Sequence, residues 1–340
     1  MYRAVKFIIA VTVGVLGVTQ ITACDSSDSS AKNIKVGVVW GGRGDQSFSD
    51  SAAKGLDRAK NQLGITTEEL TIPSTASEAD YESLLEQPIQ SGCDPIIAVG
   101  SQLANAVKVE AQKHPEIKFA IVDDSSVKLP NVTSLVFSEE QSSYLVGVAA
   151  ALKSKSDIIG FIGGVDIPVI HKFEAGFAAG VKSVKPDNRV ISKYLTKPPD
   201  FAGFISPELG KTAANDLLDA GADVIYSAAG GSGVGVIAAV NAHGGAWAIG
   251  VDSDQYQQSS LAPYRNVILT SALKNVDAAV FDYVKSVEDG KPLTGIQRFS
   301  LSNNGVGYAT SGGFLDDATK QRIGKAKQDI ISGTVNVPTE

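Results

Sequence analysis

Cysteine, histidine and catalytic motifs are scarce in this 340-residue chain, which has 2 cysteines and 3 histidines. The histidines are His114, His171 and His243, and they stand too far apart in the sequence to form a metal-binding motif. Neither a Gly-x-Ser-x-Gly elbow nor a cysteine–histidine arrangement for nucleophilic catalysis is present. The sequence therefore predicts no metal site, no cofactor and no enzyme, with a paired-carboxylate hydrolase as a distant alternative.

Long apolar runs are lacking as well, except at the N-terminus. There, Arg3 and Lys6 precede an apolar run over residues 7–18, and Ile-Thr-Ala stands directly before Cys24. A basic start, a short apolar stretch and small residues are typical of a secretory signal. Their placement before a cysteine resembles the bacterial lipobox, in which that cysteine is lipidated. A plain signal or a single membrane anchor is the alternative, although the apolar run is short for a membrane span.

We therefore expect a lipoprotein signal peptide at residues 1–23, lipidation of Cys24 and a flexible polar tether at residues 24–33. After processing, Cys93 would remain as the only unmodified cysteine, which excludes an intramolecular disulfide. Loss of the leader would leave 28 basic residues against 37 acidic ones, a net charge of −9. This balance argues against nucleic acid or an anionic membrane surface as a partner.

From residue 34 onward, short β-rich runs alternate with helical patterns, which is typical of parallel α/β sheets. The predicted strands are 34–40, 68–72, 95–99, 118–122, 132–136, 158–162, 189–194, 223–228, 246–251 and 266–271. The predicted helices are 52–63, 78–91, 101–113, 141–153, 169–184, 208–220, 233–243 and 275–289.

The pattern contains an internal repeat. The segment around Asp94 is similar to that around Asp223, and the segment ending in Asp123 is similar to that ending in Asp252. Both pairs are separated by 129 residues. This predicts two lobes with the same succession of elements, each with an aspartate at the carboxyl end of a strand, where open α/β sheets bind ligands. Asp123 and Asp252 would then face one cleft between the lobes.

Residues 228–238 join a predicted strand to a helix through a glycine-rich turn that contains Gly230, Gly231 and Gly233. This turn formally fits a dinucleotide fingerprint. Export from the cytosol disfavours a dinucleotide, because NAD is a cytosolic cofactor. The two other interpretations are a turn whose backbone N–H groups face a ligand and a turn with no binding role. Lys274 follows a further predicted strand; it is either solvated or, across the cleft from Asp252, a donor to a ligand hydroxyl.

Several runs together resemble the basic-membrane-lipoprotein family of ABC-transporter solute receptors, whose best-understood members are purine nucleoside receptors. These runs are Gly41-Gly42-x-x-Asp45-x-Ser47-Phe48, Tyr144–Ala150, Ile159–Pro168, Phe173–Gly180, Ala228–Gly233, Gly250–Gln255 and Ser271-x-x-Lys274. The resemblance implies a type I periplasmic binding protein, with two Rossmann-like α/β lobes of parallel strands joined by a three-strand hinge. It places residues 34–137 and about 272–298 in lobe 1, and residues 138–271 and about 299–340 in lobe 2.

The resemblance also implies roles for individual residues. Phe48 would be one plate of an aromatic sandwich around a purine, and Asp123 would bind the edge of the base. Asp252 and Lys274 would hold the ribose hydroxyls, and the turn from Gly230 to Gly233 would approach the ligand with its backbone. Phe204 and Tyr226 are the candidates for the second aromatic plate.

The sequence departs from the family pattern at the start of the site. Val39 stands where the family commonly has an aspartate that reaches the sugar, and Ser49 replaces an asparagine. Trp40 is interpreted as an added stacking surface, and Asp45 as a residue that orders the loop or lines the mouth of the site. These changes make a free purine base or a flavin-like heterocycle an alternative to a nucleoside.

The expected protein is therefore a monomeric, lipid-anchored receptor on the outer face of the bacterial cytoplasmic membrane. It would bind a small molecule, close about its hinge and deliver the ligand to an ABC permease. An exported sensor of the same fold without a transport role is an alternative, and a nucleoside hydrolase is a distant one.

Overall fold

The structure is a computed structural model that describes residues 1, 2, 4 and 34–340. The predicted signal peptide, Cys24 and the tether therefore lie almost entirely outside the described residues. Among the described residues, none of the helices is both long enough and apolar enough to cross a membrane.

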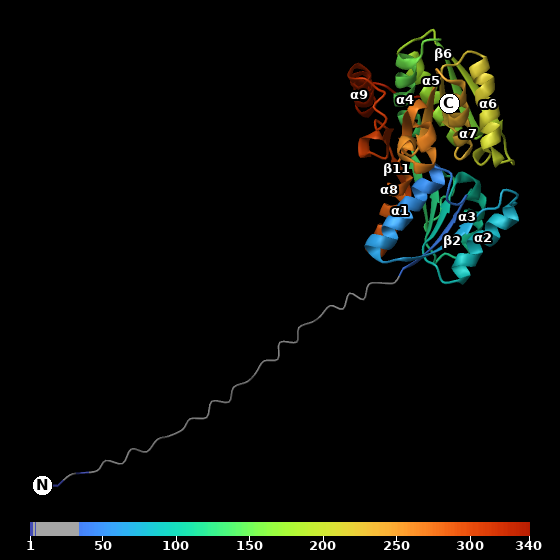
Figure 1. Cartoon of the computed structure of the whole chain (residues 1–340). Helices are drawn as coiled ribbons and strands as arrows, with labels where there is room; N and C mark the ends of the chain where they lie inside the picture. The colour runs from blue at the N-terminus through green and yellow to red at the C-terminus, as the bar shows by residue number, and fades with distance from the viewer. Residues whose placement is uncertain (3, 5–33) are drawn as a thin grey trace. The chain divides into compact units, whose positions relative to one another are not determined.

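Residues 34–340 fold around two six-stranded sheets (Figure 1). The first sheet has the order β11-β5-β4-β3-β1-β2, and the second has the order β12-β10-β9-β8-β6-β7. Apart from the antiparallel pair β10–β12, neighbouring strands are parallel. The strands are β1 Lys35–Trp40, β2 Thr66–Thr71, β3 Ile96–Val99, β4 Phe119–Val122, β5 Val132–Phe137, β6 Ile158–Val165, β7 Arg189–Thr196, β8 Val224–Ala228, β9 Trp247–Asp252, β10 Ile268–Lys274, β11 Gly295–Phe299 and β12 Val306–Tyr308.

Helices connect the parallel strands and cover the sheets. They are α1 Phe48–Leu63, α2 Glu78–Gln90, α3 Ala104–Lys113, α4 Glu139–Lys153, α5 Pro168–Lys182, α6 Pro207–Asp219, α7 Ser232–His243, α8 Val276–Glu288 and α9 Asp317–Ile331. Helices α1, α2 and α3 lie in the blue and teal half of Figure 1, and α5, α6 and α7 lie in the green and yellow half. The structure thus has two α/β lobes, and each lobe is built on one of the sheets.

The two sheets repeat one topology. If β1 to β5 are matched in order with β6 to β10, each sheet has the same succession of neighbours, with the order reversing beside β1 and β6. Within residues 34–340 the chain passes between the sheets three times, after β5, β10 and β11. The ten predicted strands and eight predicted helices are confirmed, and the prediction missed β11, β12 and α9.

Close contacts between two helices explain glycines in two of the family-like runs, Tyr144–Ala150 and Phe173–Gly180. Gly180 of α5 lies so near α4 that a Cβ there would stand 2.1 Å from the carbonyl oxygen of Tyr144. Gly147 of α4 meets the carbonyl oxygen of Phe177 in the same way, at 2.3 Å. Any larger side chain would push α4 and α5 apart, and α4 begins beside the cleft. These glycines therefore fix the position of a helix that contributes to the site.

Candidate functional site

A cavity of about 180 Å³ lies between the carboxyl ends of the strands of the two lobes. Four phenylalanine rings line it, Phe48 from the first lobe and Phe173, Phe201 and Phe204 from the second. Polar side chains lie among these rings, and they are Asp45, Ser49, Ser74, Ser101, Gln102, Asp123, Asp252 and Lys274. A concave apolar site with a few convergent polar groups is typical of a small-molecule binding site.

The two aspartates of the internal repeat both reach this cavity. Asp123 follows β4, and Asp252 ends β9, at matching positions of the two sheets. Both have left-handed backbones, with φ of 70° for Asp123 and 62° for Asp252. Residues other than glycine rarely adopt this conformation, and asparagine and aspartate tolerate it best. The shared turn points each carboxylate away from its own strand and into the cleft.

Lys274 pairs with buried carboxylates from both lobes. Its Nζ lies 2.6 Å from Oδ2 of Asp123 and 3.1 Å from Oε1 of Glu139, and only 1% of the lysine is exposed. Glu139 also pairs with Nζ of Lys172 at 3.2 Å. Burial lowers the pKa of Lys274, but the carboxylates of Asp123, Glu139 and Asp252 outweigh burial, so the pKa lies above its ordinary value. Lys274 is therefore a charged, positioned donor in the wall of the cavity.

Aromatic rings surround the same ammonium group. Nζ of Lys274 lies 5.0 Å from the ring centroids of Phe48 and Phe137 and 5.5 Å from that of Phe173. Rings attract cations through their faces, more strongly when water is excluded. Phe48 and Phe173 also line the cavity, so these two rings both hold the lysine and contribute apolar surface to the site.

Asp123 and Asp252 differ in how far their carboxylate oxygens are satisfied by hydrogen bonds. Oδ1 of Asp123 is buried and has no hydrogen-bond partner in the described part of the chain. Oδ2 of Asp252 accepts a hydrogen bond of 2.5 Å from Oγ of Ser47. Burial raises the pKa of Asp252 to about 7, although Lys274 and the Ser47 hydroxyl oppose that shift. A bound N–H or O–H group would supply the donor that Asp123 Oδ1 lacks.

The loop before α1 is ordered by its own carboxylates. Asp45 accepts backbone hydrogen bonds from Ser47, Ser49 and Asp50, and thereby caps α1 in place of the Ser47 side chain. Asp50 in turn accepts from the backbone N–H groups of Gly44 and Gln46, at 2.7 and 2.8 Å. Asp45 therefore orders this loop, and the loop places Phe48 at the first position of α1.

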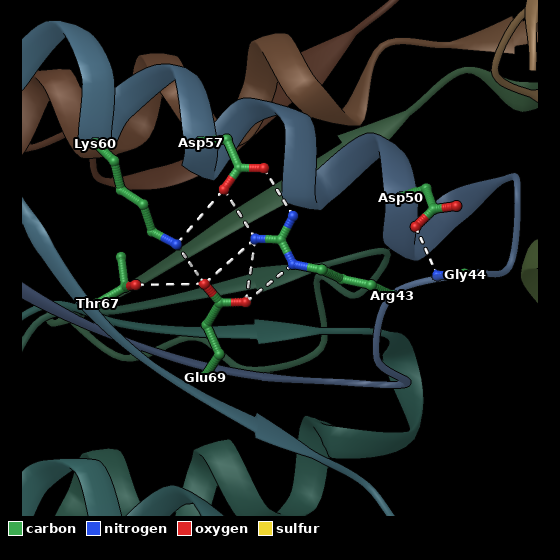
Figure 2. Close-up of polar contacts among 7 residues, drawn as sticks. All are labelled: Arg43, Gly44, Asp50, Asp57, Lys60, Thr67 and Glu69. Atoms are coloured by element: carbon green, nitrogen blue, oxygen red, sulfur yellow. Dashed lines mark hydrogen bonds and ion pairs between the residues drawn. The ribbon is translucent and has the colours of Figure 1, made fainter. Parts of the chain in front are cut away.

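Arg43 in the same loop belongs to a surface ion-pair network (Figure 2). Its guanidinium group donates to Asp57 of α1 at 2.7 and 2.8 Å and to Glu69 of β2 at 3.2 Å. Lys60 also pairs with Glu69. Arg43 does not line the cavity, where Lys274 is the only basic side chain among the described residues. The described residues that line the cavity therefore offer no unpaired cation to a phosphate group.

A group of hydrogen bonds joins the two lobes beside the cavity, and we call it the latch. It joins Gln46 and Ser47 of the first lobe to the second lobe. Besides the Ser47–Asp252 bond, the carbonyl oxygen of Gln46 accepts from Gln255 Nε2 at 3.1 Å, and Oε1 of Gln46 accepts from Ser260 Oγ at 2.5 Å. Oγ of Ser253 donates to the carbonyl oxygen of Ser47 at 3.2 Å. The latch buries polar backbone groups that an open cleft would expose to water.

The structure brings most of the predicted site residues together. Those that line the cavity are Asp45, Phe48, Ser49, Asp123, Phe204, Gly230, Asp252 and Lys274. Gly230 has a φ of 53°, and a Cβ there would lie 3.0 Å from the carbonyl oxygen of Phe204. Gly231 lies against Asp45 of the other lobe, and Gly233 faces Ser227 of β8, so neither lines the cavity.

Two predicted aromatic residues lie elsewhere, which corrects their assignment. Trp40 is 2% exposed and packs in the core of the first lobe, with the Arg43 guanidinium 5.4 Å from its ring. Tyr226 is fully buried in the middle of β8, where its hydroxyl lies 3.2 Å from Oγ of Ser143 and its ring packs on Phe177. Neither offers a face to the cleft, which leaves Phe204 as the remaining candidate for the second plate.

The prediction also missed several residues of the site. Glu139 is 1% exposed and pairs with Lys274, and Phe173, Phe201, Tyr81 and Gln102 line the cavity. Glu139 is the first residue of α4 and follows directly after the crossing from β5. The only signal for it in the sequence is a pair of acidic residues at a predicted helix start, which usually serves the helix dipole.

Residues 33–340 match the family described as "Bmp: ABC transporter substrate-binding protein PnrA-like". The "CD4+ T-cell-stimulating antigen" of Listeria innocua is 34% identical over 98% of this chain and 97% of its own length. The "ABC transporter nucleoside-binding protein BmpA" of Lactococcus lactis is 35% identical over 98% of this chain and 99% of its own. An uncharacterized lipoprotein of Pyrococcus abyssi is 35% identical over 87% of this chain and 74% of its own.

Solved structures agree with this architecture. A solute-binding protein of an ABC transporter system from Aeropyrum pernix K1 has a TM-score of 0.79 and 29% identity, covering 90% of this chain and 94% of its own. A dimeric Lac repressor has a TM-score of 0.60 and 16% identity, covering 81% of this chain and 97% of its own. The second likeness concerns the fold alone.

Proposed function

The chain belongs to the Bmp family of ABC transporter substrate-binding proteins, and from that premise we propose that it binds a purine nucleoside in the cavity between its lobes. The observation that carries this proposal is the cavity itself. It combines aromatic walls with two carboxylates on matching turns and a lysine that is already paired. A purine is flat and apolar on its faces, and its edge and sugar carry the N–H and O–H donors that carboxylates accept.

The contacts suggest a place for each part of the ligand. Phe48 and Phe204 would stack on the purine, and the unpaired Oδ1 of Asp123 would accept from its edge. Asp252 and Lys274 would hold the ribose hydroxyls. The absence of an unpaired cation among the described cavity residues favours an uncharged nucleoside over a nucleotide.

The proposal extends to anchoring and transport. Lipidation of Cys24 would hold the protein on the outer face of the membrane, as the name of the Pyrococcus relative suggests. Closure of the lobes around the three connections would trap the ligand, and the closed form would dock on an ABC permease. Mass spectrometry of the mature N-terminal peptide tests the anchor, because a C24A variant should lose the lipid mass.

A thermal-shift screen tests the ligand directly. Guanosine, inosine and adenosine, the matching free bases, ribose and riboflavin would each be added to the purified protein. A ligand at a hundred times its dissociation constant adds about 2.7 kcal/mol to the unfolding free energy. We expect a shift with at least one purine nucleoside and a smaller one or none with the free base and the free sugar.

The outcomes separate the alternatives. A shift with a base or riboflavin but with no nucleoside would overturn the nucleoside assignment and leave the family unaffected. For any ligand that gives a shift, calorimetric titration measures the affinity. A nucleoside that binds should be recovered intact when the incubated mixture is separated by chromatography. Release of free base would instead indicate a hydrolase.

A further inference from the structure

A second group of polar side chains lies outside the cavity, between helices α2 and α3 of the first lobe. Glu86 comes from α2, Glu110 from α3, and His114 follows the end of α3. One carboxylate oxygen of each glutamate and a ring nitrogen of the histidine all lie within 4.8 Å of one another. Glu110 lies in the last turn of α3, and His114 is the residue that directly follows this helix, four positions later. Helix α2 packs on α3 and brings Glu86 opposite them.

Glu110 provides the observation that points to a ligand. Its side chain is only 1% exposed, and its Oε1 accepts from Nζ of Lys113 at 2.8 Å. Its Oε2 is buried and has no hydrogen-bond partner in the part of the chain that the structure describes. That oxygen faces Nε2 of His114 at 3.7 Å. A buried carboxylate oxygen without a donor is costly, and a cation between the three groups would remove that cost.

The spacing of the three atoms suits a small metal ion. Nε2 of His114 lies 3.1 Å from Oε2 of Glu86 and 3.7 Å from Oε2 of Glu110. Bonds of about 2.0–2.1 Å in a tetrahedral site place ligand atoms about 3.3 Å apart. On the other side of the ring, Oε1 of Glu116 lies 3.6 Å from Nδ1. The nearer carboxylate, that of Glu86, shares a proton with Nε2 in the metal-free protein, and a bound metal ion would take the place of that proton.

We propose that Glu86, Glu110 and His114 bind a divalent transition-metal ion, with Zn²⁺ as the best-fitting ion, and that this ion fastens α2 to α3. Two carboxylates with one imidazole form a mixed oxygen and nitrogen set. Calcium and magnesium prefer oxygen alone, whereas imidazole suits zinc and its neighbours. Three protein ligands leave a fourth position for water. No spacing of ligand residues along the chain indicates this site, because its ligands come from two helices and include only one histidine.

The matched control is Glu82, one turn before Glu86 on α2. Its carboxylate lies 3.7 Å from Nζ of Lys113, and it is not part of the ligand set. The experiment uses the processed chain without a polyhistidine tag, stripped with EDTA. Zn²⁺ would be titrated by calorimetry into the wild type and into the E82Q, E86Q and H114Q variants, with thermal unfolding measured in parallel.

We expect one Zn²⁺ per wild-type chain and a rise in melting temperature with the metal. E82Q should behave like the wild type, and E86Q and H114Q should lose at least about tenfold in affinity. Absence of Zn²⁺ binding by the wild type, or equal binding by E86Q and H114Q, would overturn the proposal.

A further variant keeps the test sharp if a buried substitution disturbs folding. Glu116 is 67% exposed, so E116Q should fold normally. Its carboxylate lies beyond hydrogen-bond distance of the His114 ring, so E116Q should bind zinc like the wild type and serves as a second control. Co²⁺ in place of Zn²⁺ should give visible bands of a tetrahedral site in the wild type and in E82Q. Cobalt bands that persist unchanged in E86Q would refute the ligand set.

Discussion

Replacing Asp252 with asparagine should stabilise the ligand-free protein above neutral pH, although Asp252 lines the binding cavity. Burial raises the pKa of Asp252 to about 7, whereas an aspartate in the unfolded chain has a pKa of about 3.9. The folded chain therefore holds this proton more tightly than the unfolded chain does. The resulting stability is fully present below about pH 4, and it is lost as the pH rises through about 7.

The size of the effect follows from the shift. The pKa of Asp252 rises from about 3.9 in the unfolded chain to about 7 in the folded one. At about 1.4 kcal/mol for each step of one in pKa, the cost of ionising the buried group is at most about 4 kcal/mol. Asparagine removes that cost, but its amide must find a partner, so we expect a net gain of about 1–3 kcal/mol at pH 8. For a body of this length, that is a rise in melting temperature of about 2–5 °C. Asparagine also tolerates the φ of 62° at this position.

The assay is thermal unfolding of the wild type and D252N without ligand, at intervals from about pH 5 to about pH 8.5. The gap between the two melting temperatures should widen most steeply from about pH 5 to about pH 6.5 and level off above about pH 7, because between the two pKa values only the folded wild type keeps the proton. A gap that stays constant with pH, or a variant that is less stable at every pH, would refute the reasoning.

The matching aspartate of the first lobe is the control. Asp123 lies 2.6 Å from Nζ of Lys274, and both are buried. Burial raises the pKa of Asp123 as well, but D123N also leaves part of the lysine charge without its partner, which typically costs about 3–5 kcal/mol. It should therefore lower the melting temperature at neutral pH. The two repeated aspartates should thus change stability in opposite directions, while each substitution weakens nucleoside binding.

Three further predictions concern the cleft. F48A should lose about 1–3 kcal/mol of nucleoside binding free energy, as measured by calorimetry, because it removes one stacking face; unchanged affinity would place Phe48 outside the contact. W40F should lower the melting temperature through a core cavity and leave nucleoside affinity unaltered, and a large loss of affinity would contradict the buried position of Trp40. G230V should weaken binding and stability together, because valine is strained at a φ of 53° and its Cβ meets the carbonyl oxygen of Phe204; wild-type values for both would argue against that strain.

The elements that could be predicted from the sequence are those with a continuous apolar signal. The central strands are buried on both faces and read as runs of valine, isoleucine and alanine. β11 has the sequence GIQRF with no buried residue, and it was missed because it lies at the edge of its sheet. α9 buries only Ile323 and Ile330 among its 15 residues, so it lacks an apolar stripe.

The same physical difference separates the site residues that could be predicted from those that could not. Asp123 and Asp252 are found through the repeat, because equal topology places equal strand ends at one cleft. Trp40 and Tyr226 were misassigned because alternate residues of a strand point to opposite faces, and sequence alone does not say which face meets the cleft. Glu139 pairs with a lysine 135 positions later in the chain, and no local spacing encodes such a pair.

The latch has a consequence for the time that a ligand stays bound. Gln46 contributes its carbonyl oxygen and its side chain to the latch, yet it does not line the cavity. The hydrogen bonds that hold the lobes together are therefore partly separate from the groups that touch the ligand, and each is worth about 1 kcal/mol. A change at Gln46 would lengthen or shorten the residence of every ligand by a similar factor without altering the order of preference among them. Selectivity and residence time thus depend in part on different residues, and Gln46 offers a position at which residence time can be changed alone.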